Sequence, residues 1–340
     1  MSSVDVIVPC YRYGHFLREC VESVLKQSFR NVRVLILDDA SPDNTAEVGA
    51  ELAREDSRVT LVRHNVNKGH IATYNEGIDW VSAHYMLLLS ADDYLLPGAL
   101  DRAAALLDSH PDVGFVFGRA VELGSSGTNT QTGSIAGYEA ESSARVLTGI
   151  QFIELSGPHN IVPTPTAVVR TTLQKRLGGY CIDLPHAGDM EMWLRLAANA
   201  SVGILDAHLA VYRRHADNMS HAYLTKNRIP DLEQRKAALD RFGQYCGDTL
   251  KSGAALHRRL LSLLGRDAIG YASAAFNDDD MDACRKLSAF ARDVCPDVEN
   301  SWPWIKLACK RRMGIERWRA VQPVVAGLRQ RALSMKTKTT

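Results

Sequence analysis

The sequence lacks any long hydrophobic run, since no apolar stretch reaches the roughly 18 residues needed to cross a bilayer. It also has no basic segment followed by an apolar core at its start, so we expect no secretion signal. Its 7 cysteines are scattered and form no Cys-x-x-Cys pair. This argues against disulfides and a structural zinc site and favours a reducing cytoplasm. The 340 residues suffice for one large domain and a smaller one.

The chain has little net charge, but the charge is unevenly distributed. The formal net charge is +1, and residues 301–340 contain ten Lys or Arg against the single acid Glu316, so this tail carries +9 and the rest −8. Trp302, Trp304 and Trp318 lie among these basic residues. Two interpretations stay open. The tail is a helix packed on the protein with a solvated basic face, or it lies on an anionic membrane surface.

Apolar runs typical of buried strands alternate with segments of helical spacing over the first 120 residues. The expected strands are residues 4–8, 32–37, 59–62, 85–89 and 113–117, and the expected helices are 16–27, 46–54, 69–81 and 97–107. This alternation predicts β-α-β units and a mostly parallel central sheet flanked by helices, an α/β fold. A further strand is expected at 164–169 and a helix at 190–198.

Beyond residue 225 the spacing becomes entirely helical, over residues 231–245, 254–276 and 281–294. The acidic run at 278–280 is typical of a helix start. We therefore predict an α/β domain over residues 1–222 and an all-helical C-terminal region over 223–340. Dimerisation, acceptor binding and membrane contact all remain open as roles for that region.

Paired carboxylates follow two of the expected strands. Asp38 and Asp39 end the second, and Asp92 and Asp93 follow the fourth. The carboxyl ends of parallel strands meet at one edge of a sheet, where such folds bind ligands. Adjacent carboxylates repel each other unless a cation lies near, and a divalent metal bound to a phosphate would supply one. The alternative is that one of them only caps the helix that begins near Pro97.

Two loops at the same edge have features that suit a nucleotide. Tyr11, next to Pro9 and Cys10, offers a ring that can stack on a base, and Asn67 and Gly69 precede a helix N-terminus, where backbone can approach ribose or phosphate. The Asp39 carboxylate can accept the imide N–H of uracil or thymine. Together these residues describe a nucleoside-diphosphate site with a metal.

The order of these motifs resembles the family 2 glycosyltransferases over roughly residues 3–220. The resemblance rests on residues 6–11, 37–45, 67–69, 90–93, 178–180, 188–196 and 212–215, with Asn218 and Ser220. It implies the GT-A fold, which is Rossmann-like, together with a nucleotide-sugar donor, inverting transfer and a divalent metal, Mn or Mg. Ser90 stands where many members carry the first Asp of Asp-x-Asp, and Gly188 stands where many carry Glu.

The resemblance also implies a role for individual residues. Asp189 would be the general base, and we expect its position at a helix N-terminus to lower its pKa; a simple helix cap is the alternative. Trp193 would contact the acceptor, with a core position as its alternative. The remaining implied contacts are with the donor, the metal and the acceptor. The nucleotide would contact Pro9, Tyr11, Asp39, Asn67, Gly69 and Asp92, and the metal would contact Asp92, Asp93 and His215. The diphosphate would contact Arg214 and His215, and the acceptor would contact Asp183.

The expected function is inverting transfer of a sugar from a nucleotide-diphospho-sugar, with UDP or dTDP favoured, to a saccharide or lipid-linked acceptor. The resemblance places this reaction in bacterial surface polysaccharide synthesis, in the cytoplasm or at the inner face of the membrane, without a nucleic-acid partner. A sugar-phosphate nucleotidyltransferase is disfavoured because the loop at residues 9–14 is not Gly-rich. A catalytically degenerate nucleotide-sugar-binding scaffold is the alternative.

Overall fold

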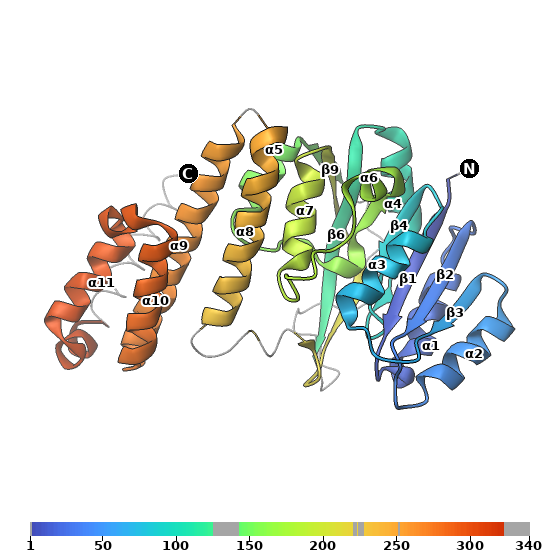
Figure 1. Ribbon diagram of the computed structural model, residues 1–340, viewed down its shortest axis with the longest axis horizontal. Coiled ribbons are helices and arrows are strands. Elements are labelled where there is room, and N and C mark those ends of the chain that lie inside the picture. The colour runs from blue at the N-terminus through green and yellow to red at the C-terminus, as the bar shows by residue number, and fades with distance from the viewer. Residues whose placement is uncertain (1, 125–142, 220–222, 224–227, 251, 323–340) are drawn as a thin grey trace. The chain divides into compact units, whose positions relative to one another are not determined.

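The computed structural model of the chain describes residues 2–124, 143–219, 223, 228–250 and 252–322 (Figure 1). Contacts divide the chain into two units, one of residues 1–221 with 237–254 and one of residues 222–236 with 255–340. The proposed division into residues 1–222 and 223–340 differs from this grouping at residues 237–254, which make their contacts with the first unit.

The N-terminal half of the first unit is a parallel sheet. Its strands are β1 (Val4–Cys10), β2 (Val32–Asp38), β3 (Val59–Arg63) and β4 (Tyr85–Leu88), in the spatial order β3-β2-β1-β4. The helices that connect them are α1 (Gly14–Leu25), α2 (Thr45–Glu55) and α3 (His70–Trp80). These elements confirm the predicted β-α-β units, with ends within three residues of those expected from the sequence.

The other half of the sheet is mixed. β8 (Val168–Arg170) lies antiparallel between β4 and β6 (Val113–Gly124), and β9 (Ser201–Arg214) runs parallel to β6. β5 (Tyr94–Leu95) and β7 (Ala144–Leu147) pair antiparallel with β9. The predicted strand at 164–169 is wrong in its first half, which is the 3-10 turn η1 (Thr164–Thr166). Pro165 accounts for this, because it has no N–H for a ladder.

Helices cover both faces of the parallel strands. Val4, Val6 and Val8 belong to a core shared with α1 and with α4 (Ala99–Ser109). Ile7 points to the opposite face, where it approaches Gly77 of α3 so closely that a Cβ there would lie 2.4 Å from Ile7 Cγ2. Burial on both faces explains why β1 and β2 are mostly apolar, apart from Asp5 and Arg33, which pair with each other. The remaining helices of this unit are α5 (Gly149–Ser156), α6 (Thr171–Leu177) and α7 (Gly188–Ala197).

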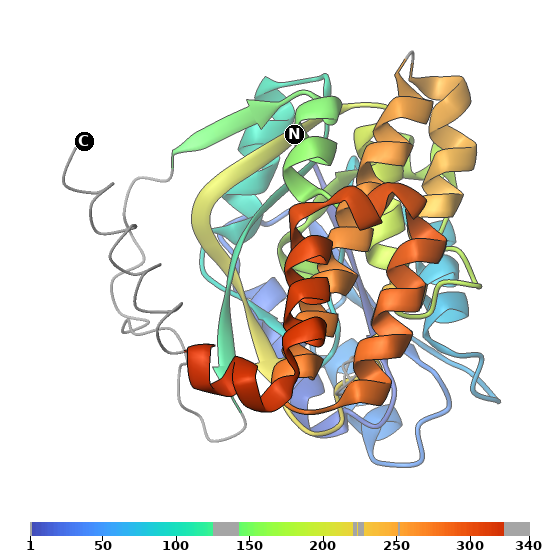
Figure 2. The same cartoon turned by 90° about the vertical axis from the view of Figure 1, so that its left-hand side faces the viewer.

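The helices beyond residue 228 confirm the predicted all-helical region. They are α8 (Ile229–Thr249), α9 (Gly253–Asn277), α10 (Met281–Val294), the turn η3 (Pro296–Asn300) and α11 (Trp302–Met313). Figures 1 and 2 show α9, α10 and α11 side by side, in orange to red. Asp280 caps α10 by accepting the Ala283 N–H at 3.0 Å, as its acidic start predicts. Within the described ranges no helix is both long and apolar enough to span a membrane.

Candidate active site

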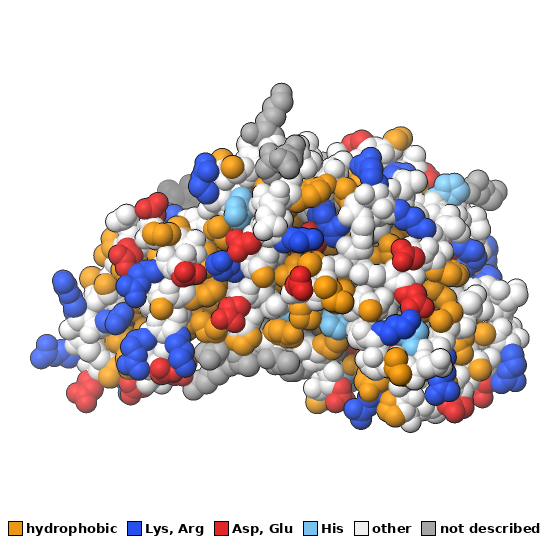
Figure 3. Space-filling view, in the orientation of Figure 1, with side chains coloured by type: hydrophobic (Ala, Val, Ile, Leu, Met, Phe, Trp, Pro, Cys, Tyr) orange, Lys and Arg blue, Asp and Glu red, His pale blue; other side chains and the backbone are white. Residues whose placement is uncertain are grey.

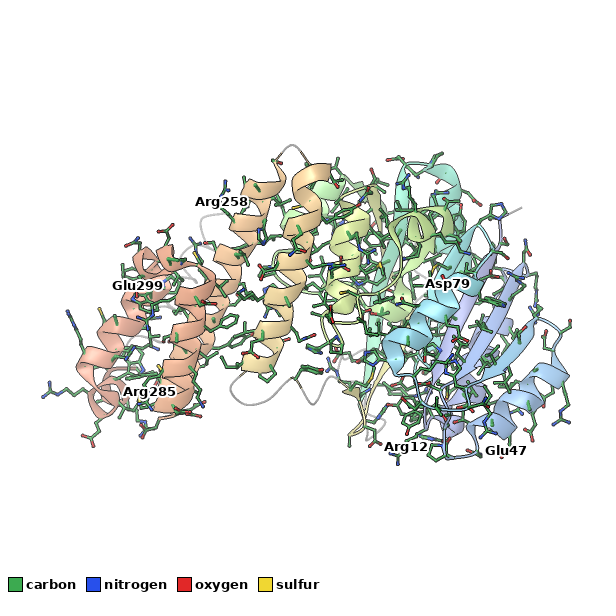
Figure 4. All side chains as sticks on the ribbon, viewed as in Figure 1. Arg12, Glu47, Asp79, Arg258, Arg285 and Glu299 are labelled. Atoms are coloured by element: carbon green, nitrogen blue, oxygen red, sulfur yellow. The ribbon has the colours of Figure 1, made fainter. Side chains whose placement is uncertain are left out.

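The loops after β1 and β2 each hold a residue in the left-handed backbone region, Arg12 at φ 63° and Ala40 at φ 58°. Neither is glycine, so each conformation costs on the order of 1–2 kcal/mol. Contacts between the two loops hold both residues in this conformation. The Arg12 N–H donates to Ser41 Oγ at 3.0 Å and the Gly14 N–H donates to Asp43 Oδ2 at 3.1 Å. Strain held in this way clusters at ligand sites, and Figure 4 shows Arg12 near the end of the sheet where these loops emerge.

Pro9 and Tyr11 lie directly beside the second of these loops. Pro9 pairs with Leu37 across the β1–β2 ladder, and the Asp39 N–H donates to Cys10 O at 2.9 Å. The Tyr11 side chain follows at this point and is 43% exposed, so its ring is accessible to a planar ligand. The structure therefore brings Pro9, Tyr11 and Asp39 together at one edge of the sheet.

The Asp39 carboxylate is fixed by three donors. Oδ1 accepts the Lys68 N–H at 2.8 Å and faces His64 Nδ1 at 2.7 Å, while Oδ2 accepts the Gly69 N–H at 2.9 Å. Burial raises the pKa of Asp39, but these donors outweigh it and the pKa is lowered overall. The carboxylate is therefore ionised at neutral pH, and Oδ2 keeps one lone pair for a ligand donor.

Asn67 and Gly69 complete the loop that holds Asp39. Asn67 Nδ2 donates to Asp39 O at 3.2 Å, and Asn67 Oδ1 accepts the Gly69 N–H at 3.0 Å. Gly69 has φ 84°, which a side chain would oppose, and it immediately precedes α3. The predicted nucleotide residues Asp39, Asn67 and Gly69 therefore form one hydrogen-bonded cluster.

Asp92 faces two residues that follow the end of β9, His215 and Asn218. Asp92 Oδ2 lies 3.1 Å from His215 Nε2 and accepts from Asn218 Nδ2 at 3.3 Å. Asn218 also accepts the His215 N–H at 2.6 Å, which fixes the loop that carries the imidazole. Burial raises the pKa of Asp92, and the histidine contact partly opposes this. Asp92 and His215, predicted from distant parts of the sequence, are thus brought together.

Asp93 points into the protein toward Arg213. Its Oδ1 accepts the Arg213 N–H at 3.0 Å, while Arg213 Nη1 donates to Asp92 O at 2.6 Å. The guanidinium lies between the rings of Phe16 and Tyr94, at 4.8 and 4.7 Å. Burial, followed by the charge of Asp92, raises the pKa of Asp93 well above its usual range. These contacts give Asp93 a structural role that competes with the expected metal contact.

Arg214 points away from this pair. Its guanidinium binds Glu122 of β6, with Nη2 to Oε1 at 2.8 Å and Nε to Oε2 at 3.2 Å. Successive strand residues face opposite sides of a sheet, so Arg213 and Arg214 cannot both face Asp92. The arginine that contacts the Asp92–Asp93 pair is therefore Arg213, whereas the sequence interpretation assigned the diphosphate contact to Arg214.

Asp189 is the second residue of α7 and does not cap it. Its Oδ2 accepts the Thr164 hydroxyl at 2.8 Å, and the Tyr180 hydroxyl also bonds to the carboxylate. Burial is the largest influence and raises the pKa of Asp189, although Thr164 and Tyr180 partly oppose it. The expected lowering by the helix N-terminus is therefore wrong, because loss of hydration outweighs the helix dipole.

Tyr74 of α3 links the Asp92 loop to Asp189. The charges of Asp189 and Asp92 both add to its burial in raising the pKa of Tyr74, and its hydroxyl bonds to the Ser90 side chain. Its ring lies 5.4 Å from the ring of Tyr180, which holds Asp189. The charges of the candidate base and of the candidate diphosphate-side carboxylate therefore both act on one buried tyrosine.

The two predicted acceptor residues have different surroundings. Asp183 is exposed on the loop before α7. Trp193 is only 4% exposed and packs 5.3 Å from the ring of Phe115, so it has the core position that was its alternative. Trp193 lies about one helical turn after Asp189, on the face of α7 that packs against the sheet.

Among the described side chains, no group of three or more His, Cys, Asp and Glu residues lies close enough to hold a metal ion. The Asp92–His215 pair nevertheless offers one oxygen and one nitrogen ligand 3.1 Å apart. Mg²⁺ in nucleotide sites is usually bound by one or two carboxylates together with substrate phosphates. The pair therefore fits a divalent cation that arrives with a diphosphate, with Asp92 and His215 as the protein ligands.

Sequence reasoning missed three residues of this site: His64, Tyr74 and Arg213. Each acts through a neighbour that the sequence did identify, since they contact Asp39, Ser90 and Asp93 respectively. The alternation of side chains along a strand would have distinguished Arg213 from Arg214, but β9 itself was not predicted. Nothing in the sequence distinguishes His64 or Tyr74 from ordinary core residues.

Comparison with known proteins agrees with this arrangement. The profile described as Glycosyl transferase family 2 matches residues 5–175, half of the chain. The chain is similar to the glycosyltransferase GlyG of Streptococcus pneumoniae, with 37% identity over 91 residues. That alignment covers 26% of this chain and 30% of GlyG, so the chain matches less than a third of that relative's length.

Two solved structures have a similar fold. Residues 1–349 of S. aureus TarS in complex with UDP match with a TM-score of 0.64 at 19% identity, covering 96% of this chain and 91% of that one. The mannosyltransferase PcManGT from Pyrobaculum calidifontis, in complex with GDP-Man and Mn²⁺, matches with a TM-score of 0.55 at 17% identity, covering 91% and 86%. At these identities the likeness shows the GT-A-like fold alone.

Proposed function

Because the chain belongs to glycosyl transferase family 2 and is a glycosyltransferase, we propose that it moves a sugar from a nucleotide-diphospho-sugar to an acceptor hydroxyl with inversion at the anomeric carbon. The observation that carries this proposal is that the charges of Asp92 and Asp189 both act on the buried Tyr74. Asp92 on the donor side and Asp189 on the acceptor side would then serve one reaction centre.

The donor would bind at the loops after β1, β2 and β3. Asp39 keeps one acceptor position after its three internal contacts, which suits the single imide N–H of uracil or thymine. The exposed Tyr11 ring and the strained Arg12 backbone lie beside it. We therefore propose a UDP- or dTDP-sugar as the donor. TarS is solved with UDP, whereas PcManGT is solved with GDP-Man, so a guanine nucleotide is the competing donor.

The diphosphate would lie at Asp92 and His215, which would hold a divalent cation, Mn or Mg, together with the phosphate oxygens. The cation would supply positive charge to the leaving diphosphate. The chain's own contribution is positional: Asn218 fixes the His215 backbone at 2.6 Å, and Arg213 fixes the Asp92 carbonyl at 2.6 Å. Asp93 and Arg214 would act here only indirectly, given their contacts with Arg213 and Glu122.

Asp189 would act as the general base. It would accept the proton of the acceptor hydroxyl while the hydroxyl oxygen attacks the anomeric carbon from the face opposite the diphosphate. Its raised pKa suits this role, because a base is most effective when its pKa approaches the working pH. Thr164 and Tyr180 would orient the carboxylate, since both hydroxyls bond to it.

The acceptor would be a saccharide or lipid-linked saccharide of a bacterial surface polymer, with Asp183 available at the exposed loop before α7. We place the reaction in the cytoplasm or at the inner face of the membrane. A nucleotide-sugar-binding scaffold is the competing function, and a buried Asp189 whose charge acts on the same tyrosine as that of Asp92 argues against it. The helical region also remains a candidate for homodimer formation.

Membrane contact would involve α11 and the residues around it. Trp302 is 72% exposed, and Ile305, Arg311 and Arg312 are exposed on the same helix. Figure 3 shows Lys and Arg side chains over α10 and α11, with acidic residues among them. Trp318 is buried, which supports packing of part of this tail on the protein, so we propose membrane contact only for the exposed residues of α11. Residues 323–340 lie outside the described part of the chain.

The experiment begins with the nucleotide. Thermal shifts with UDP, dTDP and GDP plus Mn²⁺ identify the base, because a ligand that binds only the folded state stabilises it. Release of the diphosphate from the matching nucleotide sugars then measures turnover. We expect Asp189→Asn to reduce turnover by about 10²–10⁴-fold. Nucleotide affinity should stay close to that of wild type, because in the described part of the chain the Asp189 side chain bonds to Thr164 and Tyr180 and not to the residues proposed to bind the donor.

Asp79→Asn is the matched control, since Asp79 is an exposed carboxylate on α3 of the same unit (Figure 4). It should leave both turnover and binding unchanged. Full turnover in Asp189→Asn would remove Asp189 as the base, and absence of any nucleotide-dependent thermal shift would refute the donor assignment.

A further inference from the structure

A half-open cavity of about 610 Å³ is lined by residues of β6, β7 and β9 and of the segment before η1. Its charged lining residues are Arg119 of β6, Arg145 of β7 and Asp206 of β9, and apolar surface comes from residues such as Ile161 and Pro163. Nothing in the donor assignment uses this cavity. It is large enough for a sugar and the group attached to it.

The cavity adjoins the candidate base. Pro163 lines it, and the next residue, Thr164, donates its hydroxyl to Asp189 Oδ2 at 2.8 Å. Thr166 holds this turn in place, because its hydroxyl donates to Pro163 O at 2.7 Å and accepts the Gly118 N–H at 3.3 Å. The wall of the cavity and the hydrogen bond to Asp189 therefore belong to one short segment.

Arg119 is directed by an irregularity in the sheet. The register of β6 against β9 shifts on both sides of Arg119, which is the signature of a bulge, and bulges re-aim side chains next to active sites. Gly118 permits the close approach, since a Cβ there would lie 2.8 Å from Ala207 O and from Leu209 Cδ1. Arg119 Nη2 pairs with Asp206 Oδ1 at 2.8 Å, which neutralises its charge in part.

Arg145 supplies the excess positive charge. It is exposed on β7, where its backbone pairs with β9. Among the residues that the structure describes, its side chain makes no hydrogen bond or ion pair. With Arg119 balanced by Asp206, the charged lining carries a net charge of +1. Arginine binds phosphate and carboxylate groups through paired N–H donors, so this cavity suits an anionic ligand better than a neutral one.

We propose that this cavity binds the acceptor, and that the acceptor carries a phosphate or carboxylate group that pairs with Arg145 and, on exchange of its Asp206 contact, with Arg119. The inference rests on the proposed transfer reaction, because it is Asp189 that makes the neighbouring cavity an acceptor site. It adds a substrate class, an acidic saccharide, and names Arg145 as the residue that selects it.

The test uses the full chain saturated with UDP and Mn²⁺, so that the donor pocket is filled and a phosphate probe cannot bind there. Dissociation constants are measured by ligand-observed NMR for methyl glucoside, methyl glucoside 6-phosphate and methyl glucuronide, which differ only in the charged group. We expect at least one acidic glycoside to bind about tenfold more tightly than the neutral one, with an advantage that falls as salt is added. The two acidic probes distinguish a phosphate from a carboxylate.

Arg145→Ala should abolish most of this advantage, and Arg145→Lys should keep part of it, since lysine retains the charge without the paired donors. Arg258→Ala is the matched control, because Arg258 is an exposed arginine of α9 in the other unit (Figure 4), and it should behave as wild type. Equal affinity for all three glycosides, or an undiminished advantage in Arg145→Ala, would overturn the inference. Failure of UDP, dTDP and GDP alike to bind would instead refute the proposed function.

Discussion

The hydrogen bond from Thr164 to Asp189 gives a direct measure of how the structure prepares a base. Thr164→Val removes the hydroxyl that donates to Asp189 Oδ2 at 2.8 Å and keeps the shape of the side chain. The backbone contacts of η1 are unaffected, because Ala167 bonds to the Thr164 carbonyl. The variant therefore changes the environment of the carboxylate with little change in packing.

The sign of the effect follows from the cause of the shift. Burial raises the pKa of Asp189, and the Thr164 hydroxyl lowers it by favouring the ionised form, so loss of that hydroxyl raises the pKa further. A hydrogen bond to a charged group contributes about 1.5–3 kcal/mol. Thr164 is only half-buried, so the lower end applies, and we expect the acidic limb of the pH profile to move up by about one pH unit.

The assay is the pH dependence of kcat/KM for diphosphate release, which reports the ionisation of the free enzyme. On the acidic limb Thr164→Val should be about tenfold slower than wild type, and at the high-pH plateau the two should converge. Thr164→Ser restores a hydroxyl and should return the limb toward its original position. A uniform loss at every pH, with an unmoved limb, would refute the reasoning and indicate that Thr164 only supports the fold.

Three other perturbations test separate parts of the structure. His64→Asn removes the imidazole that faces Asp39 Oδ1 at 2.7 Å, so donor affinity measured by calorimetry should weaken about tenfold while kcat changes little; an unchanged affinity would separate His64 from donor binding. Ala40→Gly removes the steric strain at φ 58° and should raise the free energy of unfolding, measured in urea, by about 0.5–1 kcal/mol. A lower free energy of unfolding would contradict this and indicate that the loop adopts another conformation. Deletion of residues 301–340 should weaken binding to phosphatidylglycerol vesicles in a sedimentation assay, as should Trp302→Ala in the full chain, whereas equal binding by all three proteins would remove the membrane contact.

The parallel half of the sheet was predictable because its strands are buried on both faces. β1, β2 and β4 are short and mostly apolar, and carboxylates come at or soon after the ends of β2 and β4. This pattern alone locates Asp38, Asp39, Asp92 and Asp93 at one edge. Helices of ten to twelve residues between such strands leave few other topologies. The motifs at these strand ends identify the family for the same reason, since they depend on local sequence and on position along the chain.

The second half of the sheet was not predictable in this way. β9 has fourteen residues, yet its pairing with β6 is interrupted by register shifts, so it lacks a regular alternation of apolar and polar side chains. β8 is short and follows a turn set by Pro165. The face on which each β9 side chain lies therefore depended on the assembled sheet, and this decided between Arg213 and Arg214 at the Asp92 site.

The sequence by itself determined the succession of helices and strands in the N-terminal half, the family, and the carboxylates at the strand ends, because these follow from local apolar patterns. Only the tertiary structure decided which side chains meet: His64 with Asp39, His215 with Asp92, and Tyr74 with Tyr180. It also reversed the expected pKa shift of Asp189. Desolvation and contacts between distant segments depend on what the whole chain packs around a residue, and no local pattern carries that information.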